Sequence, residues 1–191
     1  MIPELIQTGL IEAGLTGAIG SGIVFVEAGL AKMRHRDLLP GVVANYRLLP
    51  GALVAPVAAI LPPVELGLGF GLIVSSMTGG GPLHWFAVPA AALFVVFAAA
   101  MAINIVRGRR MIDCGCGRSQ LRQPLSWGLV VRNLVLAALV AIHAIGVAPG
   151  ETVALADIAL ALVAGTAMFL ITLLFNALAA LAASPLASGR R

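Results

Sequence analysis

The two cysteines of the chain lie two positions apart and are its strongest candidates for chemistry. They belong to the segment Asp113-Cys114-Gly115-Cys116. Thiols at this spacing can close a small, strained disulfide ring, and strained disulfides are easily reduced, as labile or catalytic bonds must be. Neighbouring arginines would favour the nucleophilic thiolate, and Asp113 would oppose it. We therefore predict a thiol–disulfide exchange site at Cys114 and Cys116.

Two other interpretations of the cysteine pair remain open. The first is two free thiols in a glycine-rich turn. The second is a metal site completed by a partner protein, because two thiolates do not satisfy a metal ion alone. The three histidines, His35, His84 and His143, are not at metal-ligand spacing. We expect no metal site formed by this chain alone.

Polar side chains inside long apolar stretches form a second group of candidates. Ionisable residues are costly in lipid, so they serve a function or pair with one another. Four of these polar residues lie at a similar expected depth, beneath the cysteine segment: Glu27, Asn104, Arg132 and Asn133. If they face inward, they form a polar pocket in which Glu27 and Arg132, with Asp113, control proton transfer at the thiols.

Glu65 lies near the middle of another apolar stretch, just after two prolines. The prolines remove backbone hydrogen bonds and can expose carbonyl groups to an internal cavity. A structural interpretation applies equally to these charges. In that interpretation Glu27 or Glu65 pairs with Arg132 or Lys32 and simply holds the helices together.

The composition indicates the class of protein to which these residues belong. Of the 191 residues, 60% are apolar and 10% are charged, and the mean hydropathy is +1.04. A soluble domain has roughly 45–50% apolar and about 25% charged residues. This difference disfavours a soluble enzyme, a disordered chain and a nucleic-acid-binding domain, despite a pI near 10.0. We expect a membrane protein and no nucleic-acid partner.

Five apolar stretches are long enough to cross a bilayer as helices, which takes roughly 20 residues each. They run from about residues 9 to 31, 52 to 77, 85 to 106, 127 to 147 and 153 to 182. The amphipathic segment 34–51 fits a helix at the membrane surface. We predict an all-α membrane protein, with one integral membrane domain over 1–183 and a short basic tail over 184–191.

All 12 Lys and Arg residues fall on one side of this five-span arrangement. They cluster at 32–47, at 107–122, at 132 and at 190–191. The positive-inside rule places that side in the cytoplasm. We therefore expect a bacterial plasma membrane protein with its N-terminus outside and with the cysteine segment and the C-terminus in the cytoplasm.

At six places the sequence resembles the MauE branch of the MauE/DoxX membrane proteins. These are 26–32 (VEAGLAK), 43–50 (VANYRLLP), 61–65 (LPPVE), 102–104 (AIN), 113–116 (DCGC) and 132–133 (RN). The resemblance implies a four-helix transmembrane bundle, similar to vitamin K epoxide reductase and DsbB-type bundles, here with a fifth C-terminal transmembrane helix. It also implies a redox role centred on the cysteine pair.

The resemblance also implies partners. Those bundles pass electrons to a bound quinone, and we interpret Glu65 and Asn104 as candidates to line such an acceptor site. They carry a second cysteine pair, which this chain lacks, so a partner protein would supply it. Methylamine-utilisation members are linked to disulfide formation and to maturation of a periplasmic quinoprotein dehydrogenase. Cytoplasmic thiols would disfavour that role here and favour a rhodanese-like or thioredoxin-like partner.

Three hypotheses follow from the sequence. The first is a membrane thiol–disulfide oxidoreductase that exchanges electrons or sulfur with a partner protein through Cys114 and Cys116. The second is a non-catalytic assembly or scaffold subunit that docks redox or sulfur-transfer enzymes at the membrane through segment 34–50. The third is a small-molecule transporter built on the intramembrane charges, although the chain lacks paired inverted halves.

Overall fold

The computed structural model describes residues 2–78, 85–112, 124–146 and 153–182. Six α-helices make up these ranges, and they contain no strand. The helices are α1 (Ile2–Arg34), α2 (Leu39–Tyr46), α3 (Gly51–Met77), α4 (Ala87–Val106), α5 (Trp127–Gly146) and α6 (Leu155–Ala182).

Five of these helices, all except α2, are long and apolar enough to cross a membrane. A helix satisfies its own backbone hydrogen bonds, which is the condition for crossing the hydrocarbon layer. The prediction of an all-α membrane protein is therefore confirmed. The short helix α2 lies within the segment expected at the membrane surface. The prolines at 56, 62 and 63 do not interrupt α3, which continues as one helix from Gly51 to Met77.

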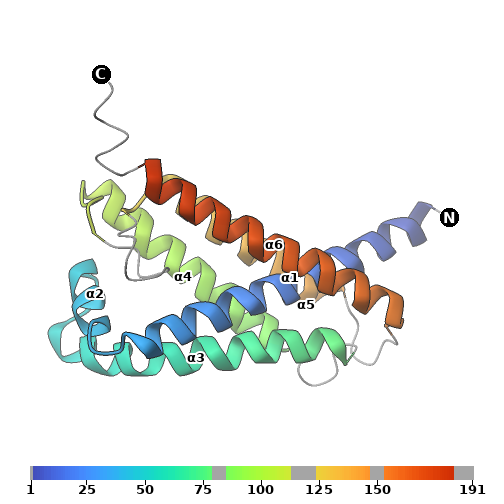
Figure 1. The fold of residues 1–191 in the computed structure, drawn as a ribbon, viewed down its shortest axis with the longest axis horizontal. Coiled ribbons are helices and arrows are strands. Elements are labelled where there is room, and N and C mark those ends of the chain that lie inside the picture. The colour runs from blue at the N-terminus through green and yellow to red at the C-terminus, as the bar shows by residue number, and fades with distance from the viewer. Residues whose placement is uncertain (1, 79–84, 113–123, 147–152, 183–191) are drawn as a thin grey trace.

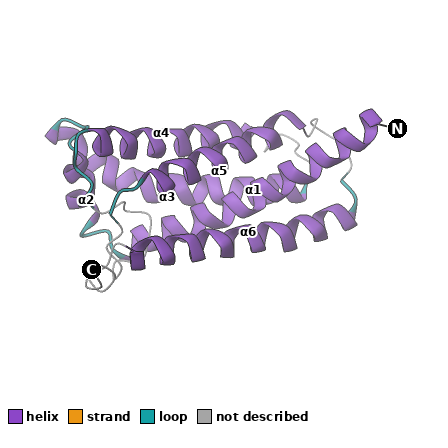
Figure 2. Cartoon of the chain, turned by 90° about the horizontal axis from the view of Figure 1, so that it is seen from above, coloured by secondary structure: helices purple, strands orange, loops and turns teal. Residues whose placement is uncertain are grey.

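Helix α1 lies at the centre of the bundle. It packs against α3, α5 and α6, and α4 packs mainly against α5. The short helix α2 crosses the end of the bundle where α1 ends and α3 begins (Figures 1 and 2). The rings of Phe25 on α1 and Phe94 on α4 stack with their centroids 4.2 Å apart, so α4 also reaches the central helix.

Glycines let α1 approach its neighbours at the distance of backbone contact. A methyl group added at Gly22 would lie 2.8 Å from the carbonyl oxygen of Gly69 on α3, and one at Gly69 would lie 2.7 Å from that of Gly22. On another side of α1, a methyl group at Gly20 would lie 2.8 Å from the carbonyl oxygen of Gly165 on α6. In lipid, such close packing of small residues drives helix association.

Helices α3 and α4 contact each other much less. They meet near one end, where the ring of Phe86 fills the space beside Gly71. Toward the other end α3 stays with α1 and α4 stays with α5, and α2 packs against α3. This divergence leaves a groove between α2, α3 and α4.

The α1–α3 contact can be tested with two alanine substitutions in one helix. Gly69→Ala should destabilise the bundle by about 1–3 kcal/mol because its methyl group overlaps the backbone of α1. Gly67→Ala is the matched control, since a methyl group there meets no atom within 4 Å. The measurement is the thermal unfolding midpoint in detergent. Equal midpoints for the two variants would contradict the close contact.

Candidate functional site

A buried ion pair joins α1 to α3 near the end of the bundle that carries α2. The ammonium Nζ of Lys32 donates to Oε1 of Glu65 at 2.7 Å, and the two side chains are 9% and 0% exposed. Lys32 Nζ also lies 5.8 Å from the centre of the Phe97 ring on α4. Charges withdrawn from water require such partners. The pair and the ring therefore connect three spans.

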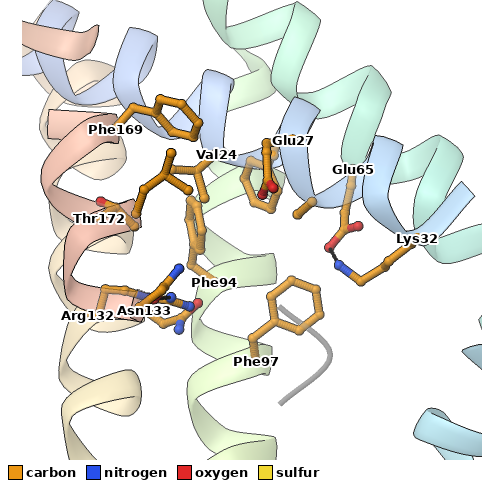
Figure 3. Close-up of a pocket in the computed structure, with 14 residues that line it drawn as sticks. Val24, Glu27, Lys32, Glu65, Phe94, Phe97, Arg132, Asn133, Phe169 and Thr172 are labelled. Atoms are coloured by element: carbon orange, nitrogen blue, oxygen red, sulfur yellow. Dashed lines mark hydrogen bonds and ion pairs between the residues drawn. The ribbon is translucent and has the colours of Figure 1, made fainter. Parts of the chain in front are cut away.

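Beside this pair is a small cavity of about 30 Å³, lined by polar and by apolar side chains. It has room for about two water molecules. Its polar lining comes from α1, α3, α5 and α6: Glu27, Lys32, Glu65, Arg132, Asn133, Thr172 and Asn176. Figure 3 shows these helices surrounding the cavity, with the ion pair at one side and Arg132 and Asn133 at the other.

Arg132 and Asn133 are adjacent on α5 but are held differently. A guanidinium nitrogen of Arg132 donates to Oδ1 of Asn176 on α6. Arg132 Nε is buried and has no hydrogen-bond partner among the residues that the structure describes. The amide of Asn133 donates to the carbonyl oxygen of Leu129 in its own helix at 2.8 Å. Arg132 therefore has a donor left for a ligand or water in the cavity.

Glu27 is the carboxylate of this cavity that the ion pair does not use. It is half-buried on α1 and points into the space shown in Figure 3. Within the described ranges it makes no hydrogen bond or ion pair. Glu27 is therefore a candidate functional group, because an intramembrane carboxylate without a partner carries a free-energy cost.

Asn104 does not line this cavity. Its Nδ2 donates to the carbonyl oxygen of Ala100 at 3.0 Å, and its Oδ1 accepts a hydrogen bond from Arg109 at 3.0 Å. Arg109 also donates to the carbonyl oxygens of Asn45, at 2.8 Å, and Tyr46, at 3.4 Å. Asn104 therefore supports an arginine that ties the end of α4 to the end of α2.

The cysteine segment, with Asp113, Cys114 and Cys116, lies outside the described residues. The residues on either side of it are described. The amide of Leu125 donates to the carbonyl oxygen of Arg110 at 2.9 Å, so the chain leaves and re-enters the bundle at neighbouring points. Both points lie at the end of the bundle that carries α2, because Arg109 contacts α2 directly.

The structure changes the set of residues in the pocket that the sequence predicted. Glu27, Arg132 and Asn133 do come together, and Asn104 is separate from them. Glu65 joins the same cavity through its pairing with Lys32, one of the pairings considered from sequence. Sequence reasoning missed Thr172 and Asn176 as lining residues. Their four-residue spacing, which places them on one face of α6, was the available signal.

No group of three or more His, Cys, Asp or Glu residues in the described ranges is placed to hold a metal ion. The fold and the cavity define a polytopic α-helical membrane protein with an intramembrane cluster of paired and unpaired charges. Such a cluster is more than lipid anchoring requires, because each intramembrane charge carries a free-energy cost.

Comparison with known proteins gives the family. A family model described as "Methylamine utilisation protein MauE" matches residues 11–146, and the chain belongs to this family. The match includes the whole cysteine segment and stops before α6. No solved structure matches the chain.

Curated relatives carry the same description. The chain is 45% identical over 166 residues to "Methylamine utilization protein MauE" of Paracoccus denitrificans, with 87% of each chain covered. It is 35% identical over 175 residues to the protein so named from Paracoccus versutus, covering 88% of this chain and 87% of the relative. The protein so named from Methylophilus methylotrophus is 45% identical over 117 residues, covering 61% and 57%.

The ion pair generates a prediction about stability. Lys32→Met and Glu65→Met should each destabilise the bundle by about 3–5 kcal/mol, because each leaves a buried charge without its partner. The double variant should be more stable than either single variant. Unfolding in a detergent series measures all three proteins. Arg34→Met, at an exposed position of α1, is the control. Additive effects of the two single changes would contradict a direct interaction.

Proposed function

We propose that the chain acts in methylamine utilisation as an integral membrane thiol–disulfide redox protein. Its family and its relatives over most of its length carry the methylamine name, which supports the process. The observation that supports the chemistry is the position of the cysteine pair in the sequence, between two described residues that lie together at one end of the bundle. Cys114 and Cys116 belong to a segment whose two ends are joined by the Leu125–Arg110 hydrogen bond. The intramembrane charges lie beneath that end of the bundle.

The exchange step uses both cysteines. One thiolate attacks a sulfur of a partner's disulfide; the partner's S–S bond breaks and a mixed disulfide forms. The second thiolate attacks the mixed disulfide, which releases the partner as a dithiol and leaves Cys114 bonded to Cys116. Two electrons pass to the partner. In the opposite direction the oxidised pair takes two electrons from a partner's dithiol.

Glu27 and Arg132 are proposed to handle the protons of this exchange, with Asp113 beside the thiols. Arg132 lies five residues after the first residue of α5, which is about 7.5 Å along the helix axis. Glu27 lines the same cavity, where water can connect the carboxylate to the guanidinium. The unpartnered carboxylate and the spare Arg132 donor support this role.

An electron acceptor of the quinone class would take two electrons and two protons from the reduced cysteine pair. The polar cavity beside Glu65 does not fit such a ligand, because about 30 Å³ is far below the roughly 300–1,000 Å³ of small-molecule sites. Asn104 has both polar atoms of its side chain in hydrogen bonds already. We therefore assign neither Glu65 nor Asn104 to a quinone.

We propose that the α2 end of the bundle faces the cytoplasm. Arg34 ends α1, Arg47 follows α2, and Arg107 and Arg109 follow α4, so basic residues gather at one end. The hydrogen bonds from Arg109 to the end of α2 support this shared location. Positive charge of this kind is retained on the cytoplasmic side. The thiol partner is then a cytoplasmic thioredoxin-like or sulfur-transfer protein.

The orientation is tested with a membrane-impermeant maleimide. Cys114 and Cys116 should remain unlabelled in intact spheroplasts and become labelled after lysis. A variant with a cysteine at position 4, Glu4→Cys in a background of Cys114→Ser and Cys116→Ser, should be labelled in intact spheroplasts, because Glu4 precedes the first span. Labelling of Cys114 and Cys116 in intact spheroplasts would invert the topology and make the partner periplasmic.

The cysteine chemistry is tested by complementation of a strain that lacks its own copy of this protein. Cys114→Ser/Cys116→Ser should abolish growth on methylamine, because neither exchange step can occur. Ser119→Ala, in the same segment, is the control and should restore growth. Immunoblots of membranes ensure equal abundance. Full growth with the cysteine-free variant would exclude thiol exchange and favour the assembly role, in which α2 docks a partner enzyme.

A further inference from the structure

Three arginines lie together where the end of α2 meets the end of α4. Arg47 directly follows α2, and Arg107 directly follows α4. A guanidinium nitrogen of Arg107 lies 3.5 Å from the carbonyl oxygen of Arg47, although 60 positions separate the two residues. Arg109 lies beside them, bound to the last carbonyl groups of α2. We call these residues the arginine cluster; α2 and the end of α4 share one end of the bundle in both views (Figures 1 and 2).

The arginine cluster has no negative partner among the residues that the structure describes. No carboxylate in the described ranges forms an ion pair with it. The acceptors of its hydrogen bonds are all neutral: the carbonyl oxygens of Asn45, Tyr46 and Arg47, and the side-chain oxygen of Asn104. Neighbouring guanidinium groups repel one another, so an anion that lies between them is stabilised. The paired N–H donors of a guanidinium suit a phosphate in particular.

The backbone of Arg47 is a second indication that this charge is used. Its φ of 50° and ψ of 41° are left-handed, and it is the only non-glycine residue with a positive φ among the described residues. The position ends α2, where glycine or asparagine is the usual choice. A residue with a larger side chain is disfavoured in this conformation. Strained positions of this kind occur preferentially at functional sites.

An apolar groove begins at the arginine cluster. It has a volume of about 620 Å³ and lies between α2, α3 and α4. Tyr46 and Leu48, on either side of Arg47, line the groove, and so does Ile103, one helical turn before Arg107. Two arginines therefore stand at the end of an apolar channel. This combination fits an amphiphile that has a hydrocarbon chain and an anionic head group.

The membrane is the source of such an amphiphile. The α4 wall of the groove includes Val96, Ala99 and Ile103, which are exposed and lie within the candidate span Ala87–Val106. These residues face acyl chains when the helix crosses a bilayer. An acidic protein would contact the arginines but would leave the groove empty. A head group that also carries an amine would be repelled by the arginines and would meet no carboxylate there, so a net negative head group is favoured.

We infer that the arginine cluster and the groove form a binding site for an anionic phospholipid of the phosphatidylglycerol kind. The phosphate binds Arg47 and Arg107, and an acyl chain lies in the groove along α3 and α4. Arg109 holds the end of α2 against α4 and so positions the other two. Basic pockets between transmembrane helices recognise anionic lipids in this way. The site uses neither the cysteine pair nor Glu27, so it does not rest on the proposed function.

The head-group contact is tested by native mass spectrometry of the full chain, titrated in detergent with phosphatidylglycerol. Arg47→Gln/Arg107→Gln should weaken binding about tenfold or more, because two charges that attract the phosphate are removed. Arg34→Gln/Arg36→Gln is the matched control, since it removes the same charge at exposed positions that do not line the groove. It should bind as the wild type does. Equal affinities of the two double variants would overturn the site.

The place of the acyl chain is tested with two neighbouring valines of α4. Val95 and Val96 are both exposed, and of the two only Val96 lines the groove. Val96→Phe should weaken binding of phosphatidylglycerol, because its ring occupies the groove, while Val95→Phe should bind as the wild type does. Thermal unfolding midpoints show that both variants are folded. Equal affinities of the two folded variants would overturn the placement of the chain in the groove.

Competition in the same assay identifies the occupant. Phosphatidylethanolamine with the same acyl chains, inorganic phosphate and a polyglutamate peptide should all fail to displace phosphatidylglycerol. Displacement by phosphatidylethanolamine would overturn the preference for a net negative head group. Displacement by phosphate would show that the arginines bind the anion without its lipid. Displacement by the peptide would assign the surface to an acidic protein, and either of these last two results would overturn the lipid site.

Discussion

The close contact between α1 and α3 is the constraint on which the remaining structure depends. Lipid tails are as apolar as leucine side chains, so burial of apolar surface does not drive helices together within a bilayer. Gly22 and Gly69 remove the side chains that would separate the two backbones. The antiparallel helices then bring Lys32 opposite Glu65, and a buried ion pair forms that neither helix could tolerate alone.

The same central helix arranges two different environments around this pair. On one side, α5 and α6 close a small polar cavity that contains Glu27 and Arg132. On the other side, α4 follows α5 rather than α3 and leaves an apolar groove under α2. Lys32 and Phe97 separate the two spaces and line both. The cavity that we propose for proton handling and the apolar groove therefore share one wall.

Helix α6 lies beyond the part of the chain that the family model matches, yet it contributes to the cavity. Asn176 accepts a hydrogen bond from Arg132, and Thr172 lies one turn earlier on the same face. The fifth span is thus not only an added anchor. It supplies the partner that an arginine within the membrane requires.

The sequence by itself determined the class of protein and the places of the five candidate spans, and it marked the polar residues that are candidates for chemistry. These follow from local composition, because a spanning helix must be apolar and an intramembrane charge is conspicuous. Tertiary structure alone decided which charges meet. Glu27 and Glu65 were equally plausible partners for Lys32, and only the glycine contact of α1 with α3 selects Glu65. Asn104 shared the expected depth of the pocket but faces Arg109, because depth fixes a position along the membrane normal and helix rotation fixes the direction of a side chain.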